Sequence, residues 1–213
     1  MLEAAARPGG QGIAPEAEQK AQPLGPEPAL EQWGSTPEEK QLAFQEIVET
    51  HLFKEFWRPV ELEAGPCTPL LEVIPGDGDC LFTAVSKYLD FCHKDPLTPT
   101  LLRRLVGDLI LSEDPKNYAM WGVLSDNEAP ARSVAAYAEA MKRPQGIYGG
   151  ELELAALQRS LGFSYHIFNR PRGNRVSSRM LGNEQYPVPL LLLYHTHQRH
   201  YDLVLPVRAR PTG

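Results

Sequence analysis

The sequence has few cysteines, no cluster of basic residues and no long apolar run. Its 213 residues include only three cysteines, Cys67, Cys80 and Cys92, at spacings that fit no disulfide framework. This pattern argues against a secreted disulfide scaffold and favours a reducing compartment, the cytoplasm or also the nucleus, where a thiol stays free for chemistry. A net charge of -6 without a Lys/Arg run argues against nucleic-acid binding. Since no apolar run approaches the length of a membrane span, we expect no membrane association. We also expect a monomer.

Residues 1–36 contain almost no large apolar side chain and are rich in Ala, Gly, Pro, Gln and Glu. Such a segment buries too little apolar surface to offset the entropy lost on ordering, so it is predicted to be a disordered tail. At Ser35–Glu39, a hydroxyl residue followed by proline and two acids is typical of a helix start. Apolar residues at helical spacing then predict a helix over 37–59 that Pro59 ends and that packs on the domain. Residues 60–208 are predicted to form that domain.

The domain sequence predicts helices first and strands later, with one globular core. The order favours an α/β or α+β class with a small sheet. Residues 113–130 are expected to be irregular or weakly helical, and 170–186 to form a long exposed loop with room for a short strand. The predicted helices cover 78–91, 98–111, 133–142 and 151–161, and the predicted strands cover 165–168, 190–194 and 201–205, with an apolar run at 70–74 left open between strand and extended lead-in.

Cys80 lies where a turn rich in glycine and aspartate meets a predicted helix. Gly76 and Gly78 permit a tight turn with exposed backbone amides, and Asp77 suits a turn or N-cap position. In the first turn of a helix, the dipole and the free N–H groups favour a thiolate over a thiol. The same amides could stabilise the oxyanion of a tetrahedral intermediate. The alternative is a small buried cysteine without chemistry, which is the commoner role of a lone cysteine.

His200 is the best candidate for the base that a thiolate nucleophile requires. It begins an apolar strand, and Asp202 lies two residues on, so both side chains point to one face of that strand. Asp202 can then accept a hydrogen bond from the imidazole and fix its tautomer, the role of a third triad member. Cys80 and His200 are 120 positions apart, so only the fold could bring them together. A partly exposed strand histidine remains the alternative for His200.

Three short blocks, in this order, resemble the ovarian-tumour (OTU) family of cysteine proteases. Asp77–Phe82 resembles the nucleophile motif of that family, Tyr148–Leu157 resembles its middle block, and His200–Asp202 resembles its histidine motif. Two positions depart from the family pattern. Asp79 stands where the family often has Asn, and Tyr148 stands where it often has Trp. The extra negative charge of Asp79 beside the thiolate would disfavour the charged sulfur.

The resemblance implies a papain-like α/β fold, in which helices flank a small central sheet. It also implies hydrolysis of isopeptide bonds at the C-terminus of ubiquitin or polyubiquitin through an acyl-thioester intermediate. In that reaction Cys80 is the nucleophile, His200 is the general base and then the acid, and Asp202 orients the histidine. Asp77 shapes the active-site turn, and its amide and that of Cys80 hold the oxyanion. Whether Asp202 or Asp77 is the third triad member stays open.

Two other functions remain open for such a chain. One is a non-catalytic ubiquitin-binding module that kept the fold without turnover. The other is a cysteine hydrolase that acts on another ubiquitin-like modifier. Glu151 and Glu153, at a predicted helix start, could attract the basic tail of ubiquitin, although acids are favourable there in any case.

His195 and His197 allow a metal hypothesis, because His-x-His on a strand places two imidazoles on one face. No nearby cysteine or acid completes a ligand set. The favoured interpretation is therefore a polar hairpin tip, and we expect neither a metal nor another cofactor.

Overall fold

The computed structural model describes residues 36–95, 97–112, 133–145, 147–170, 174–178, 186, 188–196 and 198–208. All of them belong to one compact unit, Trp33–Gly213. Apart from Thr36, the predicted tail lies outside the described residues, as do the segment 113–130 and most of the loop 170–186. Within the described ranges, no helix is both long and apolar enough to cross a membrane.

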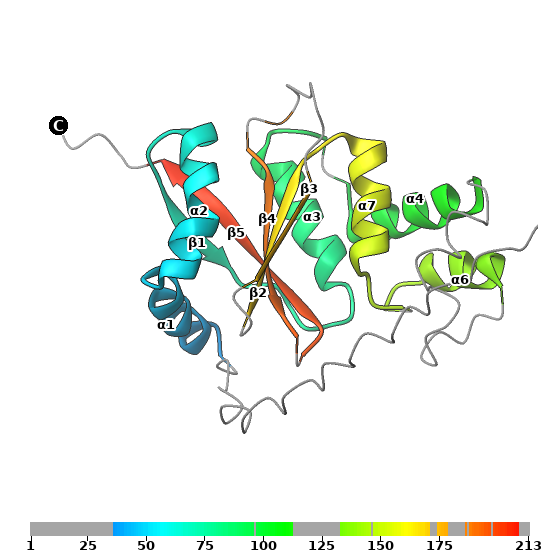
Figure 1. Cartoon of the computed structure of the whole chain (residues 1–213). Coiled ribbons are helices and arrows are strands. Elements are labelled where there is room, and N and C mark those ends of the chain that lie inside the picture. The colour runs from blue at the N-terminus through cyan, green and yellow to red at the C-terminus, as the bar shows by residue number, and fades with distance from the viewer. Residues whose placement is uncertain are drawn as a thin grey trace, which may run out of the picture. The chain divides into compact units, whose positions relative to one another are not determined.

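Helices precede most of the strands along the chain, as the sequence predicts (Figure 1). The four helices predicted within the domain are confirmed with small shifts of their ends. Of the run left open at 70–74, residues 70–72 belong to a strand and Val73 and Ile74 lie beyond it. A further strand lies in the segment predicted as a loop with room for one. The helices are α1 (Pro37–Val48), α2 (His51–Ala64), α3 (Cys80–Phe91), α4 (Pro99–Ser112), α6 (Val134–Met141) and α7 (Glu151–Leu161), and the strands are β1 (Cys67–Glu72), β2 (Tyr165–Arg170), β3 (Asn174–Ser178), β4 (Leu190–His195) and β5 (His200–Arg208).

The strands form one five-stranded sheet in the order β1-β5-β4-β2-β3. Only β2 and β4 are parallel, and the other neighbours are antiparallel. β4 and β5 form a hairpin in which His195 lies opposite His200. The histidine motif at the start of β5 is paired with β4, and β1 pairs with β5 only from Leu203 onward.

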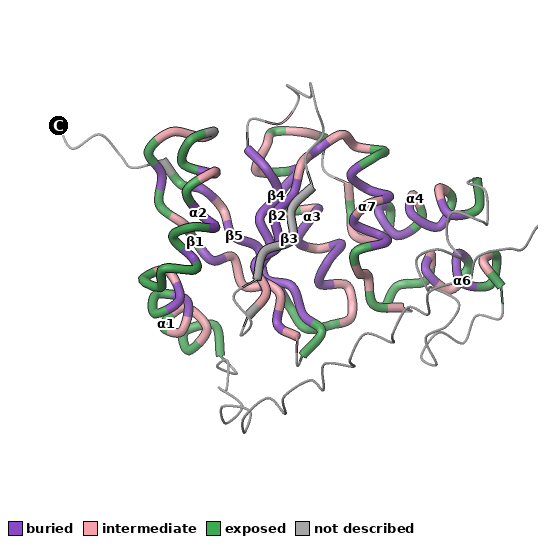
Figure 2. The backbone as a smooth tube through the Cα atoms, viewed as in Figure 1, coloured by how far each residue is buried: buried purple, intermediate pink, exposed green. Residues whose placement is uncertain are grey.

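The two faces of the sheet carry separate hydrophobic clusters, with helices over each (Figures 1 and 2). Along β5, Tyr201 and Leu203 join the cluster formed with α3, α4 and α7, whereas Val204 joins the cluster formed with α1 and α2. Because side chains alternate along a strand, Asp202 lies on the face covered by α1 and α2. The predicted α/β class, a small central sheet flanked by helices, is confirmed.

The single helix expected over 37–59 is wrong, because two helices occupy this region and Pro59 lies inside the second. Thr50 caps α2 by accepting a hydrogen bond from the Phe53 amide at 3.2 Å. Pro59 removes one hydrogen bond within α2. Trp57 and Val60 on either side are buried, and their burial against the sheet offsets that loss, so the helix continues to Ala64.

Phe53→Ala should destabilise the protein strongly, because its ring lies at the centre of the cluster under α2. Phe53 is 1% exposed, and its ring centroid lies 5.6 Å from those of Phe44 and Phe168. We expect the free energy of unfolding, measured by urea denaturation, to fall by about 3–5 kcal/mol. The neighbouring Leu52 is 50% exposed, so Leu52→Ala is the control and should cost less than about 0.5 kcal/mol. Equal losses in the two variants would contradict this packing.

Candidate active site

Cys80 is the first residue of α3 and lies at a cleft of about 240 Å³. Because it is the first helical residue, its amide has no partner within the helix and can serve as an oxyanion donor. The preceding turn requires glycine at Gly78, whose φ is +89°. The cleft is lined by Lys40, Gly76, Gly78, Cys80, Tyr148, Gln198, Arg199 and His200.

Asp77 shapes the turn before Cys80 and does not meet the histidine. Its Oδ1 accepts a hydrogen bond from the Asp79 amide at 3.0 Å, the geometry of an Asx turn. The structure therefore uses the Asp77 side chain to hold the backbone of the nucleophile turn. The role of the Asp77 amide in the oxyanion pocket stays a prediction.

Arg103 neutralises Asp79, a contact that the sequence did not reveal. This arginine of α4 is fully buried, and its Nε donates to Asp79 Oδ1. Its other nitrogens donate to the carbonyls of Gly78 at 2.8 Å and Ile147 at 2.9 Å. The expected repulsion between Asp79 and the thiolate is thus countered, because the carboxylate already faces a guanidinium. Arg103 also fixes the Gly78–Asp79 turn through these hydrogen bonds.

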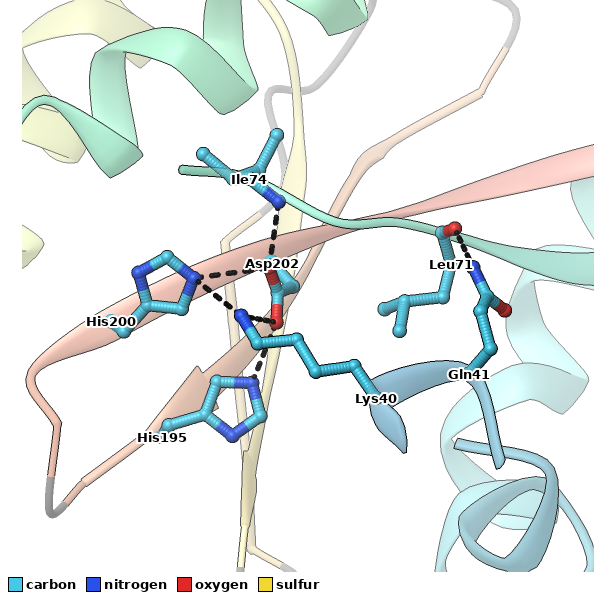
Figure 3. Close-up of polar contacts among 7 residues, drawn as sticks. All are labelled: Lys40, Gln41, Leu71, Ile74, His195, His200 and Asp202. Carbon is cyan, nitrogen blue, oxygen red and sulfur yellow. Dashed lines mark hydrogen bonds and ion pairs between the residues drawn. The ribbon is translucent and has the colours of Figure 1, made fainter. Parts of the chain in front are cut away.

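His200 and Asp202 lie on one face of β5, as predicted, and contact each other (Figure 3). His200 Nε2 lies 3.0 Å from Asp202 Oδ1, and the same oxygen accepts a hydrogen bond from the Ile74 amide at 2.8 Å. The Cys80 thiol, at the start of α3, is a second hydrogen-bond partner of the His200 imidazole. The fold therefore brings Cys80, His200 and Asp202 together, and the carboxylate that meets the imidazole is Asp202.

The charges of these groups follow from their surroundings. Burial alone would raise the pKa of Asp202, but hydrogen bonds from His195, His200 and Ile74 outweigh it and hold that pKa well below its usual range. An ionised carboxylate only accepts hydrogen bonds, so Nε2 of His200 carries a proton and Nδ1 is left for the thiol. Burial works against a charged His200, but the hydrogen bonds to Asp202 and Cys80 and their negative charges raise its pKa to about 9.

A second histidine, His195 at the end of β4, contacts the other oxygen of the same carboxylate. Its Nε2 lies 3.1 Å from Asp202 Oδ2, and the residue is 5% exposed. Burial lowers the pKa of His195, so the imidazole is neutral and donates its Nε2 proton. The polar hairpin tip expected here is therefore a buried hydrogen-bonding position for His195, while His197 lies outside the described residues. The sequence contained a signal for this position, because a short hairpin between the two predicted strands places His195 opposite His200.

Lys40 of α1 is the second residue of the site that the sequence did not reveal. Its Nζ lies 3.4 Å from Asp202 Oδ2, and the side chain also lines the cleft beside Cys80. The sequence pattern of α1 predicted only a helix that packs on the domain. No local signal marks a lysine as the partner of a residue 162 positions away.

The middle block supports α3 and does not offer two acids to a substrate. An added Cβ at Gly149 would lie 2.7 Å from a methyl carbon of Leu81, so only glycine allows this close approach to α3. Glu153 is 2% exposed and accepts hydrogen bonds from the Gly150 amide at 2.7 Å and the Tyr137 hydroxyl at 2.6 Å. Burial raises its pKa. The expected attraction of Glu153 for a basic tail is therefore wrong, whereas Glu151 is exposed.

Residues 75–201 match the family described as OTU-like cysteine protease. The matched residues make up more than half of the chain and include Cys80 and His200, and the thiol and imidazole occupy the positions that a cysteine protease requires. The chain belongs to the OTU family of cysteine proteases.

Individual proteins also resemble the chain in sequence or in fold. It is 28% identical over 137 residues to "Ubiquitin thioesterase otu2" of Schizosaccharomyces pombe, an alignment that covers 62% of this chain and 44% of that relative. The chain thus spans less than half the length of this relative. An OTU deubiquitinase from Wolbachia pipientis wMel has the same fold, with a TM-score of 0.50, 14% identity and coverage of 66% of this chain and 90% of that one. The same enzyme bound to ubiquitin gives a TM-score of 0.51 at 15% identity, with coverage of 65% and 96%.

Arg103→Met should destabilise the protein because it leaves the Asp79 carboxylate without its cation and the Gly78 carbonyl without a donor. Loss of one partner of a buried pair costs about 3–5 kcal/mol, measured as the free energy of unfolding in urea. Arg104, the next residue, is exposed, and Arg104→Met is the matched control. Adding Asp79→Asn to Arg103→Met removes the unpaired charge and should recover part of the loss. No difference between the Met variants at 103 and 104 would refute this role.

Proposed function

We propose that the protein is a thiol-dependent deubiquitinase that hydrolyses isopeptide bonds at the C-terminus of ubiquitin. The observation that carries this proposal is the meeting of Cys80 and His200 at one cleft, with the buried Asp202 in contact with the histidine, in a chain of the OTU family. The substrate class rests on the relatives, whereas the thiol chemistry rests on the geometry. A reducing compartment such as the cytoplasm suits a nucleophile that must stay a free thiol.

The reaction would begin with attack of the Cys80 thiolate on the carbonyl carbon of the isopeptide bond. The carbonyl oxygen becomes an oxyanion, which the amide of Cys80 and the predicted amide of Asp77 would stabilise. Protonated His200 then gives its proton to the leaving lysine amine, and the C–N bond breaks to leave an acyl thioester on Cys80.

Deacylation would use His200 in its neutral form. The imidazole takes a proton from water as the water oxygen attacks the thioester carbonyl carbon. The tetrahedral intermediate collapses, the C–S bond breaks, and the ubiquitin C-terminal carboxyl group and the Cys80 thiolate are released beside protonated His200. The cycle therefore requires His200 to alternate between its two protonation states while Asp202 stays charged.

The test is reaction with ubiquitin that carries a C-terminal electrophile, followed by mass spectrometry and by cleavage of isopeptide-linked diubiquitin. Wild type and Cys92→Ala should form the adduct, since burial raises the pKa of Cys92 and makes its thiol a poor nucleophile. Cys80→Ala should form none. Asp202→Asn should lower kcat/KM by about 100-fold or more, because the carboxylate orients the base, and Asp77→Ala should lower it less.

The other outcomes identify the alternatives. Binding of ubiquitin that survives Cys80→Ala, with no adduct and no cleavage in wild type, would indicate a non-catalytic ubiquitin-binding module. An adduct formed only with a probe built on another ubiquitin-like modifier would indicate a different substrate. If His200→Ala turned over substrate at the wild-type rate, the assignment of the catalytic residues would be refuted.

A further inference from the structure

The active-site carboxylate has a cationic partner that comes from outside the residues that match the family. The match begins at residue 75, whereas Lys40 lies in α1, the first helix of the described chain. Lys40 Nζ lies 3.4 Å from Asp202 Oδ2 and 3.4 Å from His200 Nε2 (Figure 3). An N-terminal segment thus places a positive charge within the catalytic group.

Lys40 is held in this position by its neighbours on α1. Gln41 Nε2 donates to the Leu71 carbonyl of β1 at 2.7 Å, which ties the start of α1 to the sheet. One turn further, Phe44 is buried in the cluster on the α1–α2 face of the sheet. The Lys40 side chain is only 13% exposed. Its ammonium therefore stays near Asp202 without having to be ordered for each turnover.

The contact between Lys40 and His200 is not a hydrogen bond. His200 Nε2 carries a proton that it donates to Asp202, and the ammonium is also only a donor. Both groups therefore contact the same carboxylate, His200 at Oδ1 and Lys40 at Oδ2. When His200 is protonated, Lys40 faces a second positive charge at short range, which favours release of the imidazole proton.

The charges around Asp202 differ between the two halves of the catalytic cycle. Asp202 is fully buried, and a buried carboxylate without a cation is strongly disfavoured. While His200 is protonated, the imidazolium compensates it. After His200 has given up its proton, His195 cannot replace that charge, because burial keeps His195 neutral. The charged and titratable groups that face the pair from the surrounding elements are Lys40 of α1, Cys80 of α3, His195 of β4 and, at the cleft, Arg199.

We propose that Lys40 is the permanent counter-ion of Asp202 and, through it, a positioning residue that allows His200 to alternate between its protonated and neutral forms. The expected effect of Lys40 on catalysis rests on the proposed function. Its expected effect on the protonation of His200 concerns only groups within this chain. α1 is then a part of the catalytic apparatus and not only a cover for the sheet.

Loss of the Lys40 charge should raise the pKa of His200. Lys40 is the one lysine or arginine that contacts Asp202 among the described residues, so in its absence the imidazolium compensates the carboxylate and the proton is held more tightly. The neutral imidazole that deacylation needs would then be scarcer at neutral pH, so the acyl thioester should accumulate. The thiolate–imidazolium pair that acylation needs would persist, and it would be lost only at a higher pH than in wild type.

The primary test is an NMR titration of the histidine ring protons in Lys40→Met, with His200 assigned by the signal absent from His200→Ala. The pKa of His200 should rise by about one pH unit relative to wild type. Lys40→Arg keeps the charge and should titrate close to wild type. Lys54→Met, the matched control, removes a lysine charge that pairs with Glu49 on the protein surface, so its His200 pKa should be unchanged.

A second measurement follows turnover of a ubiquitin C-terminal thioester or amide substrate. Lys40→Met should show slower deacylation, with more acyl-enzyme trapped by acid quench, and a loss of activity at high pH that is displaced upward from that of wild type. Lys40→Arg should restore both. An unchanged His200 pKa in Lys40→Met, with or without a loss of thermal stability, would overturn the proposal and leave Lys40 a structural contact.

The two measurements keep the proposals separable. If wild type does not act on ubiquitin but the His200 titration responds to Lys40→Met and not to Lys54→Met, the counter-ion role stands and the substrate assignment fails. If ubiquitin is cleaved but the titration does not respond, the proposed function stands and the role of Lys40 is refuted. Should Lys40→Met fail to fold, Lys40→Gln supplies the same loss of charge for both measurements.

Discussion

The buried carboxylate of Asp202 is the group on which the arrangement of the site depends. It has no exposed surface and accepts hydrogen bonds from four donors. These donors come from α1, from the segment that follows β1, from β4 and from β5 itself. Because an ionised carboxylate in the interior is tolerated only when its oxygens are satisfied, each of these segments must be in place before the charge is stable. The same interaction that orients His200 therefore ties together the elements around it.

The nucleophile depends on a second buried charge of opposite sign. Arg103 holds the Gly78 carbonyl and the Asp79 carboxylate, and so fixes the turn that presents Cys80. The thiol and the imidazole are thus positioned independently, the first through a buried cation of α4 and the second through a buried anion of β5. Their relative geometry depends on how the two halves of the core pack on the sheet, because no covalent or local link joins them.

Local patterns predicted the parts of the site that are close in sequence. Glycine and aspartate before a helix placed Cys80 at a helix start, and alternation along a strand placed His200 and Asp202 on one face. The contacts of Lys40 and Arg103 could not be predicted, because long flexible cations carry no periodic signal and their partners are set by the tertiary packing. Pro59 was misread for the related reason that burial of its neighbours outweighs a local rule.

The helices α1 and α2 have a consequence for where the folding unit begins. Sequence similarity to the family starts at residue 75, yet among the described residues the helices packed on the sheet face that carries Leu71, Leu191 and Leu193 are α1 and α2, which precede this point. A fragment cut at the limit of the similarity would expose that apolar face to water and to other copies of itself. It would also lose β1, which would leave β5 as an unpaired edge. The limit of family resemblance is thus not a domain boundary, because the cover of this sheet face and the contact of Lys40 with Asp202 both come from residues that precede it.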